Sequence, residues 1–298
     1  MKSLCRTILD MPEFAGLKSR LEGSGGVTMV CGVPPAFRAI LAAAIRRETG
    51  RFTAILCATD AAATAMAGDV SFFSGLEGVV LPGREPVFYP VEGISRSFEQ
   101  QRLAVFHQVL QGQAGFLIAT PEALMLRTVP PALLKESVIK LAVDEDYPMD
   151  ELTEKLVAMG YRRADQVEGP GQFARRGGIL DVFPAQLSQP VRIEFFGDTV
   201  DAMGVFNPVS QRRTDNLRRV EILPAGEVVP AMAPGGLAVL AEKVRNLLKG
   251  KKNVPQKLSE TIAADAAALE NNTPLTAADR YLPLIYPDFA CALDYLPE

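Results

Sequence analysis

The stretch from Gly160 to Asp198 constrains the fold more than any other part of this chain. Its sequence is GYRRADQVEGPGQFARRGGILDVFPAQLSQPVRIEFFGD. Short runs of alternating apolar and polar residues are typical of antiparallel strands, and paired glycines are typical of the turns between them. The stretch therefore predicts a small twisted sheet whose strands and loops carry arginine. None of these residues forms a catalytic pattern. We therefore interpret the stretch as a binding surface.

A helix is predicted immediately before this sheet, over Asp150–Met159, and Gly160 suits its C-terminal cap. The last strand of the stretch, Val191–Phe196, alternates in character, so its side chains divide between two faces. One face carries Arg192, Glu194 and Phe196, and the other carries Val191, Ile193 and Phe195.

The part of the chain before residue 129 predicts a parallel α/β sheet. Apolar runs that suit buried strands alternate with helical patterns, and that order is typical of parallel sheets. The expected strands are Val27–Cys31, Phe52–Cys57, Val79–Leu81 and Phe116–Ala119. The expected helices are Pro12–Glu22, Pro35–Arg47, an Ala-rich helix capped by Asp60, Phe98–Leu110 and Pro121–Leu126.

The remaining chain predicts an insertion followed by a return to the first sheet. We expect residues 1–128 to form the first part of the α/β domain, residues 129–213 an inserted α+β domain, and residues 214–298 the second part. The insertion would begin with a strand at Glu136–Leu141. The expected elements after it are a returning strand at Leu217–Leu223, helices at Pro234–Leu248 and Pro255–Leu269, and a strand-and-turn segment at Pro283–Leu296 that completes the first sheet.

Composition limits the classes of function. The 298 residues suit about two domains of ~100–200 residues each, and a net charge of −4 argues against a dedicated nucleic-acid binder. The four cysteines are far apart in the sequence and there is one histidine, so we expect no metal site. No apolar run is long enough to span a membrane, and the first residues do not form a signal peptide, so we expect a cytoplasmic protein.

The stretch Cys31–Ala39 lies where a nucleotide-binding P-loop would follow a first strand. A P-loop needs glycines that expose backbone N–H groups, a lysine that reaches the phosphates, and a Ser or Thr that holds magnesium. The sequence here is CGVPPAFRA, which has no second glycine, no lysine and no hydroxyl residue, and Pro34 and Pro35 remove N–H donors. We therefore expect neither catalysis nor a bound cofactor in this chain.

Three sequence blocks carry a family resemblance: GQFARRGGILDVFP, PVRIEFFGD and FNPVSQRR, which begin at Gly171, Pro190 and Phe206. In sequence and spacing they resemble the small inserted domain of the excision-repair protein UvrB, and even more the same domain of the bacterial transcription-repair coupling factor, Mfd. The resemblance implies the fold class α/β, a degenerate P-loop helicase-like parallel sheet domain with an inserted α+β domain. It also implies an N-terminal fragment, whose ATP- and magnesium-dependent motor and polymerase-binding region would lie beyond Glu298.

The resemblance further implies a partner, UvrA, which this module would recruit to RNA polymerase stalled at a DNA lesion. In the full-length protein the same surface would be covered by the C-terminal region, and RNA polymerase and DNA would be bound by the absent domains. By position, the implied UvrA-binding residues are Arg163, Arg176, Arg192 and Glu194, with Arg162 and Arg175 less certain. Arginine suits such a surface because its planar fork pairs with carboxylates.

The residues by themselves leave other interpretations open. Arg192 and Glu194 could simply pair with each other, and Gly177-Gly178 could serve only hairpin geometry. Arg175 alternates with Arg176 along a strand and should lie on the opposite face. Two other functions also remain: a nucleotide-binding helicase fragment, which a nucleotide-induced rise in melting temperature would favour, and a DNA-binding module, which salt-dependent duplex binding would favour.

Overall fold

The computed structural model describes residues 7–23, 26–89 and 96–297. The chain divides into two compact units. Unit 1 consists of Met1–Gly83, Val105–Leu126 and Tyr295–Glu298. Unit 2 consists of Arg84–Ala104 and Arg127–Asp294. Helix α5 (Ser97–Leu110) begins in unit 2 and ends in unit 1.

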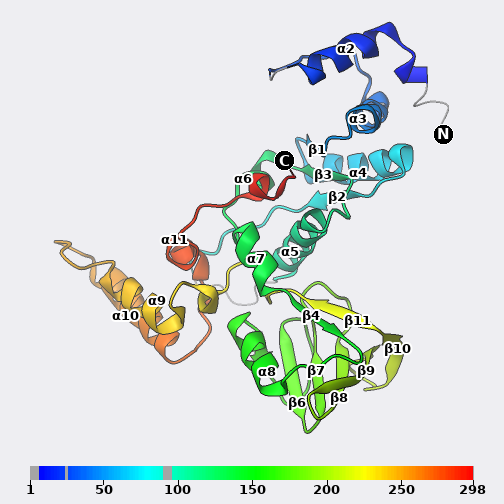
Figure 1. Ribbon diagram of the computed structural model, residues 1–298. Helices are drawn as coiled ribbons and strands as arrows, with labels where there is room; N and C mark the ends of the chain where they lie inside the picture. The colour runs from blue at the N-terminus through cyan, green and yellow to red at the C-terminus, as the bar shows by residue number, and fades with distance from the viewer. Residues whose placement is uncertain (1–6, 24–25, 90–95, 298) are drawn as a thin grey trace. The chain divides into compact units, whose positions relative to one another are not determined.

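Unit 1 is built on a three-stranded parallel sheet in the order β1-β3-β2 (Figure 1). The central strand is buried along its whole length because it has a neighbour on each side. The strands are β1 (Thr53–Leu56), β2 (Gly78–Leu81) and β3 (Phe116–Ala119). The helices are α2 (Pro12–Glu22), α3 (Pro35–Thr49), α4 (Asp60–Ser74) and α6 (Pro121–Met125). These confirm three predicted strands and all of the predicted helices of this unit, although Thr59 caps α4 rather than Asp60.

The strand predicted at Val27–Cys31 is wrong. Residues 26–31 have no strand conformation, and Val27 and Met29 are 102% and 81% exposed. An apolar run becomes a buried strand only where a neighbouring strand pairs its backbone. The described residues offer this run no such partner, so the stretch Cys31–Ala39 does not follow a strand.

Unit 2 contains a six-stranded sheet in the order β10-β9-β8-β7-β6-β5. Every adjacent pair is antiparallel, as predicted, except β5 and β6, which run parallel. The strands are β5 (Arg162–Arg163), β6 (Gln172–Arg176), β7 (Ile179–Val182), β8 (Val191–Phe196), β9 (Thr199–Phe206) and β10 (Arg213–Leu217). Helix α8 (Met149–Ala158) precedes them, and Gly160 follows it with a φ of +84°, as the predicted cap requires.

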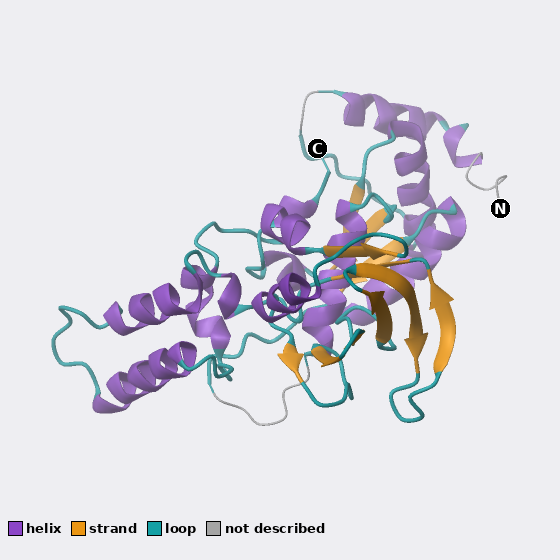
Figure 2. Ribbon diagram, turned by 60° about the horizontal axis from the view of Figure 1, so that its bottom comes forward, coloured by secondary structure: helices purple, strands orange, loops and turns teal. Residues whose placement is uncertain are grey.

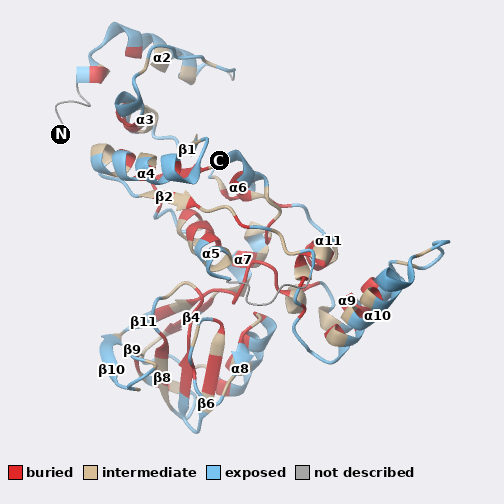
Figure 3. Ribbon diagram, turned by 180° about the vertical axis from the view of Figure 1, so that it is seen from behind, coloured by how far each residue is buried: buried red, intermediate tan, exposed pale blue. Residues whose placement is uncertain are grey.

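The core of this unit lies on one face of the sheet. Leu152 and Leu156 of α8 belong to one core cluster with buried strand residues that include Phe173, Ile193 and Met203. Figure 3 shows the buried parts of these strands in red. A two-stranded sheet of β4 (Ile139–Ala142) and β11 (Arg219–Ile222) adds to the same core. The opposite face of the large sheet is therefore the one left for polar side chains.

The two segments expected to complete the first sheet do something else. The strand predicted at Leu217–Leu223 forms as β11, but it pairs antiparallel with β4. The segment Pro283–Leu296 contains α11 (Leu282–Ile285) and η3 (Ala292–Tyr295) and no strand. Alternation and apolar content locate strands and turns, but they do not say which sheet a strand joins. The remaining elements of unit 2 are α7 (Pro131–Ser137), η1 (Pro230–Met232), α9 (Gly236–Asn246), α10 (Gln256–Glu270) and η2 (Ala278–Tyr281).

A buried network of charges centred on Glu227 connects distant segments of unit 2. Glu227 Oε2 lies 2.8 Å from Arg102 Nε and 3.1 Å from Arg84 Nε. Arg84 Nη1 lies 2.8 Å from Asp279 Oδ1, and the second oxygen of Asp279 accepts a hydrogen bond of 2.8 Å from the backbone N–H of Val87. All four charged residues are buried. Buried charges persist only when they are paired in this way, so the network joins Arg84 and Arg102 to Glu227 and Asp279.

The ionisation of Glu99, which is influenced by Arg84 of this network, should make the free energy of unfolding depend on pH. Burial raises the pKa of the Glu99 carboxyl, while Arg96 and Arg84 oppose the shift. A raised folded-state pKa means that Glu99 contributes stability below its unfolded pKa, and that this contribution is lost as the pH rises through the folded pKa. We therefore expect Glu99→Gln to raise the free energy of unfolding at pH 7 and to leave it nearly unchanged at pH 4. Urea unfolding at both pH values checks this, and a variant destabilised more at pH 7 would contradict it.

Candidate protein-binding site

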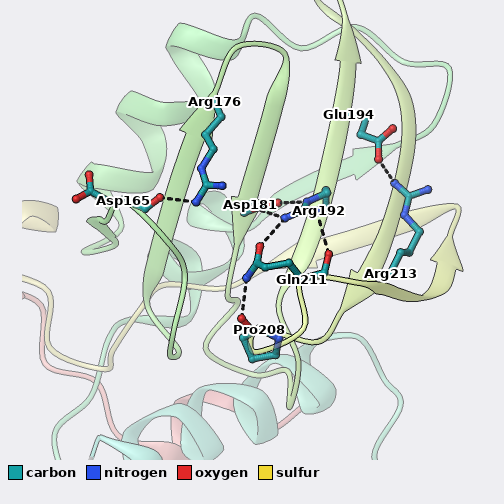
Figure 4. A network of polar contacts seen from close by, with 8 residues as sticks. All are labelled: Asp165, Arg176, Asp181, Arg192, Glu194, Pro208, Gln211 and Arg213. Carbon is teal, nitrogen blue, oxygen red and sulfur yellow. Dashed lines mark hydrogen bonds and ion pairs between the residues drawn. The ribbon is translucent and has the colours of Figure 1, made fainter.

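The candidate site lies on the face of the six-stranded sheet opposite the core (Figure 4). Residues directly opposite each other in neighbouring strands point to the same face. Arg176 of β6 lies opposite Ile179 of β7, which lies opposite Glu194 of β8. In the next row, Asp181 lies opposite Arg192. The structure thus brings Arg176, Arg192 and Glu194 to one face.

Arg192 is held by contacts within the sheet. Its Nε and Nη2 donate to the two carboxylate oxygens of Asp181 at 2.7 and 2.8 Å, and Nη2 also donates to Oε1 of Gln211 at 2.9 Å. The guanidinium stacks over the ring of Phe206, 4.5 Å from its centre. These contacts use most of its donors, and the hydrogen bond with Asp181 raises the pKa of Arg192. The side chain of Arg192 is therefore engaged mainly in contacts within the sheet, and few of its donors are left for a partner protein.

Glu194 also has a partner of its own, but not the one that its strand position suggested. It pairs with Arg213 of β10, on the far side of β9 from β8. The alternative that Arg192 and Glu194 pair with each other is therefore wrong, because each finds an opposite charge on a different strand. The Glu194–Arg213 pair is partly exposed, so a partner protein could still reach both side chains.

Arg176, unlike Arg192 and Glu194, forms no ion pair with another described residue. Its side chain is exposed, and Nη2 donates a hydrogen bond of 2.7 Å to the backbone carbonyl of Asp165. Among the described residues no carboxylate forms an ion pair with it. The hydrogen bond orients the guanidinium without neutralising it, and an oriented, charged fork is suited to a carboxylate from another protein.

Arg175 lies on the other face, as its alternation with Arg176 predicted. It is opposite Leu180, a residue of the core, and pairs with Asp150 of α8. The two neighbouring arginines of this strand therefore have separate environments. Arg175 belongs to the helix-covered side of the sheet.

Arg162 and Arg163 lie apart from the other candidates, on the short edge strand β5. Arg162 pairs in register with Gln172, which places it on the face of Arg176, whereas Arg163 pairs with Phe173 of the core face. Both are exposed, and both line a cavity of about 750 Å³ in unit 2. The candidate set is thus divided between the open face of the sheet and its β5 edge.

Gly177 and Gly178, in the turn between β6 and β7, are both required by the geometry of the chain around them. Gly177 has a φ of +59°, in the left-handed region that favours glycine. A Cβ at Gly178 would lie 2.9 Å from the carbonyl oxygen of Phe195, and the carbonyl of Gly178 accepts a hydrogen bond from the Phe195 N–H. Hairpin geometry and the close approach of β8 therefore explain both glycines.

Sequence reasoning missed the residues that organise the face. Arg213 and Gln211 become partners of Glu194 and Arg192 because β10 folds back beside β9. Ile179, which is 37% exposed, lies between Arg176 and Glu194. Arg213 and Gln211 belong to the block FNPVSQRR. Their roles depend on strand pairing, which the spacing of the sequence does not predict.

Two further observations concern the part of the chain that the structure describes. No group of His, Cys, Asp and Glu side chains there is arranged to hold a metal ion. No helix among the described residues is long and apolar enough to cross a membrane.

Comparisons with known proteins identify the class of this domain. Residues 139–227 match the family model of the UvrB interaction domain. This range begins at β4 and ends at Glu227, so it covers the large sheet, α8 and the two-stranded sheet. This part of unit 2 is therefore similar to the UvrB interaction domain.

The chain as a whole is related to the transcription-repair-coupling factors. The factor of Myxococcus xanthus is 32% identical over 247 residues, which are 80% of this chain and 20% of the relative. That of Bacillus subtilis is 29% identical over 306 residues, covering 100% of this chain and 26% of the relative. The chain thus spans about a quarter or less of the length of these relatives, and the family resemblance expected from the three sequence blocks is confirmed.

Proposed function

We propose that this chain is the UvrA-binding module of a transcription-repair-coupling factor. The observation that carries the proposal is the match of residues 139–227 to the UvrB interaction domain, in a unit whose open face presents Arg176. Arg176 is the central contact, Glu194 with Arg213 forms a second polar point, and Ile179 supplies the apolar surface between them. Arginine at the centre of an interface is a frequent hot spot.

The same proposal assigns the chain no catalytic step and no cofactor. Cys31–Ala39 lacks the lysine and hydroxyl residue of a P-loop, which supports a helicase-like α/β domain that has lost nucleotide binding. ATP-dependent release of a stalled RNA polymerase, and covering of the UvrA-binding face by the C-terminal region, would belong to a longer protein of which this chain is one part. This module would act in the cytoplasm as the recruiting surface.

Co-elution with purified UvrA tests the proposal. We expect the wild-type chain to bind and Arg176→Ala to weaken binding by about 2 kcal/mol or more, roughly thirtyfold, because truncating a hot-spot arginine has that effect. Arg175→Ala is the matched control, since it removes the same side chain from the next position of the strand, on the opposite face. A wild-type chain that does not bind UvrA, or equal losses for the two variants, would remove the proposed site.

A further inference from the structure

A helical hairpin in unit 2 lies outside the UvrB interaction domain. Helices α9 and α10 pack side by side (Figure 2). Leu240 and Val244 of α9 and Ile262 and Ala266 of α10 are buried. Helix α9 contacts η1 and α11. The loop of residues 247–255 joins the two helices at the end of the hairpin remote from η1.

The charge of this hairpin end is opposite to that of the whole chain. Residues 243–257 contain six of the 31 Lys and Arg residues and none of the 35 Asp and Glu residues. The chain has a net charge of −4, so its positive charge is concentrated locally here. We call the five lysines of this segment the lysine tip: Lys243, Lys249, Lys251, Lys252 and Lys257.

The lysine tip is exposed to solvent. All five lysines are exposed, and within the described residues none forms an ion pair, whereas Arg245 pairs with Glu270 at 2.8 Å. Gly250 and Asn253 adopt left-handed conformations with φ of +78° and +57°, which give the connecting loop a defined turn. The N–H of Lys251 donates to the carbonyl of Leu248 at 3.1 Å within this turn. The lysines are therefore displayed on an ordered end rather than along an extended segment.

We propose that the lysine tip binds the phosphate backbone of duplex DNA. Lysine is a flexible point charge suited to phosphates, and contacts with phosphates need no particular base sequence. Residues 243–257 contain no aromatic side chain, which argues against stacking on unpaired bases and against insertion at a membrane surface. This site is separate from the UvrA-binding face, and its contribution would be to hold the module near DNA without selecting a sequence.

Fluorescence anisotropy with a labelled duplex of mixed sequence tests this proposal on the full chain. The test variant is Lys249→Gln/Lys251→Gln/Lys252→Gln, which changes only exposed side chains. The control is Lys135→Gln/Lys140→Gln/Lys155→Gln, which removes the same charge from exposed positions elsewhere in unit 2. Each lost phosphate contact lowers the slope of log affinity against log salt by about 0.9, so the test variant should lose roughly 2–3 from this slope and about tenfold or more in affinity at low salt.

Three outcomes would overturn the proposal: no duplex binding by the wild-type chain at low salt, equal losses in the test and control variants, or binding to anionic phospholipid vesicles without binding to the duplex. UvrA co-elution of the same test variant keeps the two proposals separate. The lysine variant should retain UvrA binding, and Arg176→Ala should retain duplex binding.

Discussion

Replacement of Glu227 with alanine is expected to lower the free energy of unfolding by about 3–5 kcal/mol, the largest effect that we predict for a single side chain. Glu227 is fully buried, and its carboxylate pairs with both Arg102 and Arg84. Removing it leaves two buried guanidinium groups without their shared partner, although Arg84 keeps Asp279. An unpaired buried charge is far more costly than the loss of an exposed pair.

Urea unfolding followed by circular dichroism measures this effect, since the chain contains no tryptophan. Glu270→Ala is the control because Glu270 also pairs with an arginine, Arg245, but on the surface. The control should change the unfolding curve little. Equal effects of the two substitutions would mean that the buried network contributes no more than a solvated ion pair.

The Glu227 network also shows where sequence reasoning stops. Helix positions and the strands Phe52–Cys57, Val79–Leu81 and Phe116–Ala119 followed from local periodicity, because amphipathic and buried segments have a recognisable pattern. The network joins residues 84, 102, 227 and 279, which are far apart in the sequence. Nothing at any one of these positions distinguishes a buried charge from a solvated one.

Strand pairing is the second feature that could not be predicted from the sequence. Alternation correctly predicted that Arg175 and Arg176 face opposite sides, because that is a property of one strand. It could not predict that Glu194 pairs with Arg213, that β11 pairs with β4, or that Val27–Cys31 has no neighbouring strand among the described residues. Each of these depends on which segments meet in three dimensions. The sequence therefore predicted which neighbouring residues point to opposite faces of one strand, but not which partner each side chain finds.

The pairing of Arg192 with Asp181 leads to the second large effect that we predict on the free energy of unfolding. Arg192→Ala is expected to lower the free energy of unfolding by about 2–3 kcal/mol, because it leaves the carboxylate of Asp181 buried without its bidentate partner. Asp181 is 3% exposed, whereas the side chain of Arg192 is 20% exposed. Asp181→Ala should therefore cost less, since Arg192 can turn toward water. The double variant Arg192→Ala/Asp181→Ala should be more stable than Arg192→Ala alone.

Measuring both stability and UvrA binding for each variant distinguishes a residue that stabilises the fold from one that contacts UvrA. Arg176→Ala should leave the free energy of unfolding within about 0.5 kcal/mol of wild type, as is usual for an exposed side chain, while abolishing most of the binding. Arg192→Ala should show the reverse order, with a larger loss of stability and a smaller loss of binding when both proteins are assayed fully folded. A stable Arg192→Ala chain that fails to bind UvrA would place Arg192 in the interface itself.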